Sequence, residues 1–115
     1  MDWMGVIVED SLKDVSVLDH VGIVEKRFKE LGVSGKWTVL EVSVNEEDFD
    51  KVVKKLKRGL RPAWYAYFTR KDRQVIVFKG KKFNIKKGSK KSLAHVKNWA
   101  FEKYNLLPDN FTLNL

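Results

Sequence analysis

Cationic side chains crowd the middle of this sequence, and their type and spacing support a chemical role better than any other feature. The basic residues between positions 70 and 91 are Arg70, Lys71, Arg73, Lys79, Lys81, Lys82, Lys86, Lys87, Lys90 and Lys91, with Asp72 the one acid among them. Closely spaced cations attract polyanions, including the phosphates of nucleic acids. The cluster therefore predicts a surface that binds nucleic acid or another polyanion. The alternative is a solvated edge, because charged hairpins also keep strand edges from aggregating.

Two tyrosines precede these cations on a strand that we expect at residues 63–69. Alternation along that strand places Tyr65 and Tyr67 on one face and Trp64 and Phe68 on the other. Lysines beside outward aromatic side chains are typical of sheets that bind single-stranded nucleic acid. We therefore include both tyrosines in the predicted binding surface.

Positive charge is distributed unevenly over the 115 residues, whose net charge is +8. Residues 1–50 sum to −7, residues 51–91 to +15 and residues 92–115 to zero. Such asymmetry indicates either an anionic partner for the central segment or an electrostatic match between two halves of the molecule. The sequence leaves these two interpretations open.

Patterns for catalysis or metal binding are sparse. His20 and His95 each fall on a predicted helix without a metal-ligand residue three or four positions on, and His95 instead pairs with Trp99. The acidic run after Asn45 suits the first turn of a helix, so we expect no metal site and no cofactor. A small-molecule binder or enzyme that uses the aromatic sheet face, with His20, His95 and Trp99, is an alternative function. A module that docks on proteins through an exposed apolar patch is a third.

Composition excludes several classes of protein. The chain has no cysteine, which removes disulfides, thiolate metal sites and cysteine nucleophiles. No apolar stretch approaches the ~20 residues of a membrane span, and the N-terminus lacks the basic start of a signal peptide. We therefore expect one cytoplasmic domain over residues 1–115, not bound to membranes, in which residues 1–10 are an extended or poorly ordered lead-in.

Hydrophobic periodicity indicates the elements that position these residues. Helical spacing predicts a first helix whose apolar stripe is Val17, Val21, Val24, Phe28 and Leu31. The other expected elements are a strand at 37–44, a helix at 46–58, strands at 63–69, 74–79 and 82–86, a helix that follows 89–92 and ends at Pro108, and a strand at 111–115. Without the first helix and one hairpin strand the order is βαββαβ. We therefore predict an α+β, ferredoxin-like antiparallel sheet with an additional N-terminal helix and an extra hairpin strand.

The strand predicted at residues 82–86 decides where the lysines point. Alternation turns Phe83 and Ile85 inward, and it turns Lys82 and Lys86 outward. We expect the preceding two-residue turn to be formed by Gly80 and the residue after it.

The aromatic strand and the hairpin after it also carry a resemblance. Trp64–Phe68, the run from Val75 to Phe83 and the early segment Glu9–Asp14 resemble an uncharacterised family of small archaeal and bacterial proteins of similar length. The likeness extends from about Val8 to the last helix. It implies a single cytoplasmic domain, and it supplies neither an activity nor site residues.

Overall fold

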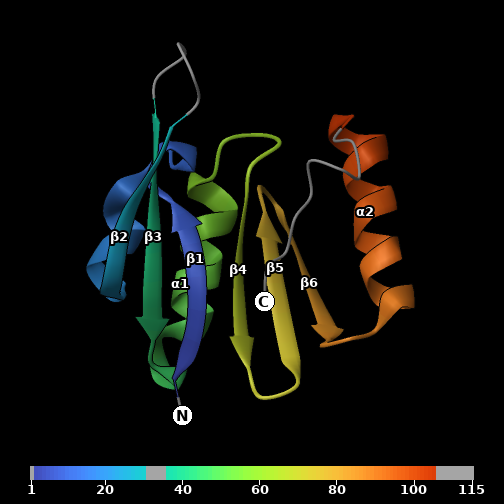
Figure 1. Ribbon diagram of the computed structural model, residues 1–115, viewed down its shortest axis with the longest axis horizontal. Helices are drawn as coiled ribbons and strands as arrows, with labels where there is room; N and C mark the ends of the chain where they lie inside the picture. The colour runs from blue at the N-terminus through green and yellow to red at the C-terminus, as the bar shows by residue number, and fades with distance from the viewer. Residues whose placement is uncertain (1, 31–35, 106–115) are drawn as a thin grey trace.

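The fold is seen in a computed structural model, which describes residues 2–30 and 36–105 (Figure 1). The strands are β1 (Trp3–Val8), β2 (Gly22–Glu30), β3 (Lys36–Val44), β4 (Tyr65–Arg70), β5 (Arg73–Phe78) and β6 (Lys81–Lys86). The α-helices are α1 (Glu46–Gly59) and α2 (Lys90–Tyr104), and the 3-10 segments are η1 (Glu9–Ser11) and η2 (Val15–His20).

These strands form one sheet in the order β2-β3-β1-β4-β5-β6, and each neighbouring pair is antiparallel. β1 lies at the centre, between the β2–β3 hairpin and the β4–β5–β6 meander (Figure 1). The predicted α+β class is confirmed. The ferredoxin-like topology is not confirmed, because the strand order is β2-β3-β1-β4-β5-β6. A crossover does run from β3 through α1 to β4, with β1 between these two parallel strands.

The predicted first helix, whose apolar stripe begins at Val17, is wrong. The segment forms η2 and then the edge strand β2, which pairs with β3 from Gly22 to Glu30 with one irregularity, at Val24. The apolar spacing matches a helix, but Val21, Ile23 and Val24 are β-branched and Gly22 interrupts a helix. Pairing with β3 supplies the backbone hydrogen bonds, and this tertiary context overrides the local periodicity.

The N-terminal segment is extended as expected, but it is the central strand of the sheet and not a lead-in. Trp3 and Ile7 of β1 are buried in the core on the side of α1. Gly5 lies between them, against the ring of Phe68 on β4. Burial on the α1 side and pairing on both edges fix this segment in place.

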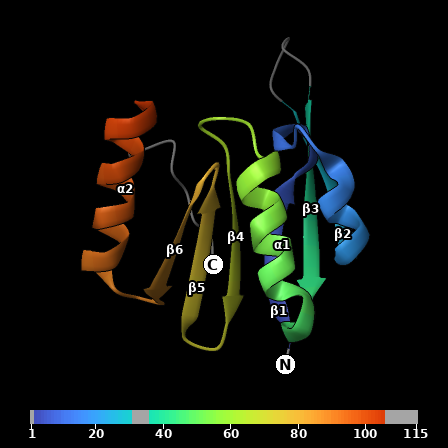
Figure 2. The same ribbon diagram turned by 180° about the vertical axis from the view of Figure 1, so that it is seen from behind.

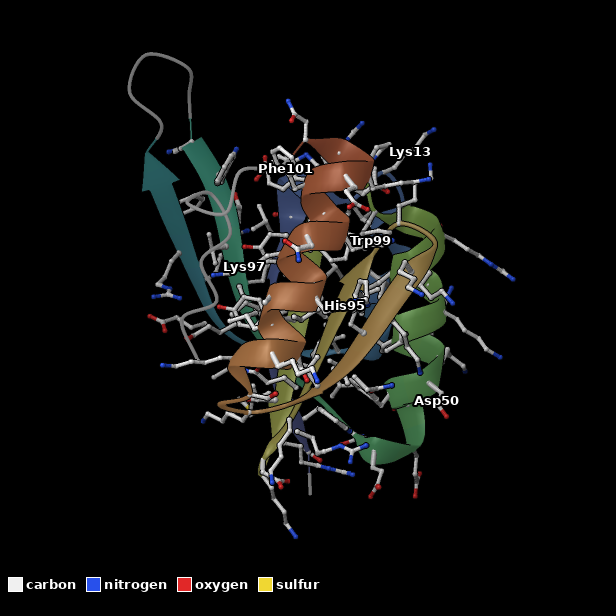
Figure 3. The ribbon with its side chains drawn as sticks, turned by 90° about the vertical axis from the view of Figure 1, so that its right-hand side faces the viewer. Lys13, Asp50, His95, Lys97, Trp99 and Phe101 are labelled. Atoms are coloured by element: carbon white, nitrogen blue, oxygen red, sulfur yellow. The ribbon has the colours of Figure 1, made fainter. Side chains whose placement is uncertain are left out.

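The two helices cover opposite faces of the sheet, and β5 contributes to both cores. Val75 and Val77 face the core that contains α1, whereas Ile76 and Phe78 face the core that contains α2. Figure 2 shows α1 in front of the sheet, and Figure 3 looks onto α2, with α1 beyond β6. The continuous apolar run of β5 is what a strand buried on both faces requires.

Most remaining elements agree with the sequence prediction. The strands at 37–44, 63–69, 74–79 and 82–86 and the helix at 46–58 are confirmed within a few residues. The last helix is confirmed with Val96 and Ala100 on its buried side. Pro108 and the strand predicted at 111–115 lie outside the described residues.

Candidate anion-binding surface

The surface begins on β6, where the predicted alternation is confirmed. Phe83 and Ile85 are buried against α2, and Lys82 and Lys86 are exposed on the other face of the sheet, the face that α1 covers. Arg73 of β5 lies directly opposite Lys86 in the antiparallel register. Alternation places the exposed Arg73 on the same face, so its guanidinium adds to the lysines.

Helix α1 brings further lysines to this side of the sheet. The Lys57 carbonyl oxygen accepts a hydrogen bond of 2.9 Å from the Gly80 amide, which fastens the end of α1 to the β5–β6 turn. Lys54 lies one helical turn earlier on the same flank of the helix. Lys55 lies on the opposite flank, where its Nζ is 3.5 Å from Ser16 Oγ. Lys54 and Lys57 therefore border β6.

We call this group of cations the basic strip. Its members come from α1, β5 and β6, and they are Lys54, Lys57, Arg73, Lys82 and Lys86. At one end of the strip, a surface depression of about 370 Å³ is lined by Asp72, Arg73, Asn84, Ile85 and Lys86. The Lys87 amide donates a 2.7 Å hydrogen bond to the Asp72 carbonyl oxygen, which holds the chain after β6 against the β4–β5 turn. The depression thus combines guanidinium, ammonium and amide donors suited to a phosphate oxygen with one carboxyl group, that of Asp72, which opposes the binding of an anion.

Arg70 lies apart from the strip and has structural partners. Its Nη1 is 2.8 Å from Glu46 Oε1 at the start of α1, and its guanidinium carbon lies 4.7 Å from the centre of the Trp3 ring. Arg70, the last residue of β4, therefore links the first turn of α1 to Trp3 of β1. The hydrogen bond from Arg70 holds the pKa of the Glu46 carboxyl below its usual 4.5.

A pH-dependent stability follows from this ion pair. Because the folded-state pKa of Glu46 is lowered, its contribution is present above pH 4.5 and is lost as the pH falls through the folded-state pKa. We expect Glu46→Gln to lower the melting temperature at pH 7 and to leave it unchanged at pH 2.5. The control is Glu47→Gln, which removes the same charge from the same helical turn. An equal effect of both variants at pH 7 would show that the helix dipole, and not Arg70, is responsible.

The tyrosines lie on the other face of the sheet. Through β5, Tyr67 lies beside Ile76 and then Phe83, so Tyr65 and Tyr67 pack at the edge of the α2 core. Their ring centres are 6.5 Å apart, and burial raises the pKa of Tyr67. The structure therefore separates both tyrosines from Lys82 and the rest of the basic strip.

The other predicted lysines occupy turns and the approach to α2. Lys71 and Lys79 lie in the two turns of the meander, and Lys81 Nζ lies 5.3 Å from the centre of the Phe83 ring, on the α2 side. The β5–β6 turn consists of Lys79 and Gly80, one residue earlier than expected, and Gly80 has the positive φ of 75° that the turn requires. The exposed lysines around Gly88 and the start of α2 are Lys87, Lys90 and Lys91.

Acidic residues of the N-terminal half form no salt bridge with the basic strip within the described part of the chain. Among the side chains of residues 2–28 and 36–105, the salt bridges are Arg27–Glu41 at 3.6 Å and Arg70–Glu46 at 2.8 Å. Acids of this half lie on β2, on β3 and at the start of α1. Asp50 of α1 is one helical turn before Lys54, but it forms no salt bridge with it. The sequence left open an anionic partner or an electrostatic match between the two halves of the molecule. The salt bridge from Arg70 to Glu46 is such a match. The cations of the basic strip have no salt bridge of this kind within the described residues.

The residues of the small-molecule alternative are not brought together. His20 ends η2 beside β2, whereas His95 lies exposed on α2 at the opposite edge of the sheet (Figure 3). Trp99 packs in the α2 core, with its ring centre 4.9 Å from that of Phe78. Within the described residues, no group of three or more His, Asp or Glu side chains could hold a metal ion.

These features define the class of the protein as an α+β domain with a six-stranded antiparallel sheet and a cationic edge. Comparison with protein-family models, with curated proteins and with solved structures finds no match. The resemblance to small prokaryotic proteins thus stays an expectation. No helix in the described part of the chain is long and apolar enough to cross a membrane.

Proposed function

We propose that this protein is a non-enzymatic module that binds double-stranded nucleic acid through the phosphate backbone. The observation that carries the proposal is the gathering of cations from α1, β5 and β6 on one side of the sheet. Among the described residues, none of these cations forms a salt bridge with an acid. A phosphate backbone would supply the missing negative charge.

The relation of the strip to the tyrosines favours a duplex over a single strand. Single-strand platforms stack unpaired bases on aromatic rings beside the cations. Tyr65 and Tyr67 lie on the opposite face from Lys82 and Lys86, so such stacking is not possible beside these lysines. Backbone contacts need only cations and polar donors, which the exposed Asn84 between the two lysines provides as well.

The test is the affinity for a DNA duplex, an RNA duplex and matched single strands over a series of salt concentrations. We expect binding to weaken steeply with salt, because each neutralised phosphate adds about −0.9 to the slope of log K against log salt. The double variant Lys82→Ala/Lys86→Ala should weaken duplex binding and flatten that slope by about 1.8.

The matched control removes two exposed lysines from outside the strip, in Lys13→Ala/Lys51→Ala. This variant has the same net charge as the first and should keep most of the affinity and slope. Equal losses in both variants would mean that net charge alone attracts the nucleic acid. Absence of duplex binding at low salt would refute the proposed function outright.

A further inference from the structure

The opposite edge of the sheet carries a second unusual surface. β2 is the edge strand there and has β3 as its neighbour in the sheet. Half of the large hydrophobic side chains that are exposed among the described residues belong to β2, and they are Ile23 (53%), Val24 (59%) and Phe28 (58%). A long edge strand with apolar side chains is a template for pairing with another strand.

Charges next to these apolar residues indicate which strand would fit. Glu25 and Glu41 are cross-strand neighbours, and Arg27 Nη2 lies 3.6 Å from Glu41 Oε1. The hydrogen bond with the Glu41 carboxyl raises the pKa of Glu25, although Glu25 is exposed. Each copy of the chain thus holds two carboxyl groups beside one guanidinium, and one more guanidinium next to Glu25 would balance them.

We propose that β2 pairs antiparallel with β2 of a second copy of this chain, about a two-fold axis through Lys26. In this register, Glu25 lies opposite Arg27 of the second copy. Val24, the extra residue at the irregularity of β2 between Ile23 and Glu25, lies near Phe28 of the second copy, where the regular pairing ends. The pairing places the guanidinium of Arg27 beside Glu25 on both sides of the axis. It covers the exposed Val24 and Phe28 side chains of both copies. It also joins the two sheets into one.

Other registers fit less well. A shift of one residue in either direction turns the two sheets to opposite faces. One shift sets Lys26 against Arg27, and the other pairs Glu25 with Lys26 but sets Arg27 against Val24. In the proposed register the two Lys26 side chains meet near the axis, which is the one contact between like charges. Lys26 is exposed, so salt screens this repulsion, and its Nζ lies 6.0 Å from the centre of its own Phe28 ring.

A two-fold axis perpendicular to the sheet has a consequence for the whole assembly. It keeps α1 of both copies on the same side of the joined sheet. The pairing rests on β2 alone and does not depend on the nucleic-acid proposal. The two proposals can therefore fail separately.

The test uses charge reversal at the two positions. Glu25→Arg sets two arginines against each other on both sides of the axis, and Arg27→Glu likewise sets two glutamates against each other. We expect the wild type to sediment as a dimer in the micromolar range, and each single variant to sediment as a monomer. A one-to-one mixture of the two single variants should form a dimer, because both opposite-charge pairs are restored between the unlike chains.

The double variant Glu25→Arg/Arg27→Glu carries both reversals in one chain and should dimerise as the wild type does. Circular dichroism of each variant separates a loss of pairing from a loss of folding. A wild type that stays monomeric throughout the concentration series would overturn the proposal. A mixture of folded single variants that stays monomeric would also overturn it, because it would place any dimer interface elsewhere.

Discussion

Gly5→Ala is expected to lower the free energy of unfolding by about 3 kcal/mol. Gly5 lies on the central strand β1, paired with Val42 of β3 on one side and Phe68 of β4 on the other. A Cβ atom at this position would overlap the Phe68 ring and the Tyr67 carbonyl oxygen. The carbonyl belongs to a strand held on both sides, so the backbone cannot move away without breaking the sheet.

The control for this prediction is Gly22→Ala on the edge strand β2. A Cβ atom there would lie 2.9 Å from Ser43 Oγ, a side-chain atom that can rotate away. We expect a change of at most about 1 kcal/mol, since alanine also reduces the entropy of the unfolded chain. Urea unfolding of both variants measures the difference. Similar stabilities of the two variants would contradict the prediction, because they would show that β1 and β4 can move apart at little cost to accommodate the added Cβ atom.

Features of the fold that depend on residues close together in the chain could be predicted from the sequence. Alternation over five residues was enough to orient Lys82 and Lys86 away from the α2 core, because a strand turns successive side chains to opposite faces. The helix at 46–58 likewise shows its acidic start, its apolar stripe and its glycine end in consecutive residues. Each of these features depends on residues that are neighbours in the chain.

Pairing between distant segments could not be predicted in the same way. Residues 22–30 have helical spacing, and only the presence of β3 beside them makes a strand the better solution. The face on which Tyr67 lies relative to Lys82 depends on the registers of two successive strand pairs, β4–β5 and β5–β6. Lysines were therefore predicted next to tyrosines that the sheet places on its other face.

The candidate site was incomplete for the same reason. Lys54 and Lys57 lie in the C-terminal half of α1, where the helix dipole alone is a sufficient reason for cations. Their nearness to β6 follows from the bond between Lys57 and Gly80 and from the packing of α1 on the sheet. The uneven charge along the chain is only partly kept apart in the fold, because α1 carries acids in its first turn and lysines farther along.

Phe78→Ala is expected to cost about 3–5 kcal/mol and to free α2 before the rest of the domain. Phe78 is fully buried on the α2 side of β5, and its ring centre lies 4.9 Å from that of Trp99 and 6.4 Å from that of Tyr104. Both partners belong to α2, and aromatic side chains make up a large part of the core around this helix. Loss of the ring therefore removes a large share of the contacts that hold the helix.

The comparison that isolates this effect is Val77→Ala, one residue earlier on the same strand. Val77 is equally buried but faces α1, so its truncation should lower stability without loosening α2 in particular. Hydrogen exchange under native conditions separates the two cases, because locally opened amides exchange faster than the global unfolding rate allows. Phe78→Ala should lose protection in α2 while β1 and β4 keep theirs. Uniform loss across all strands would instead show that the two cores unfold as one cooperative unit.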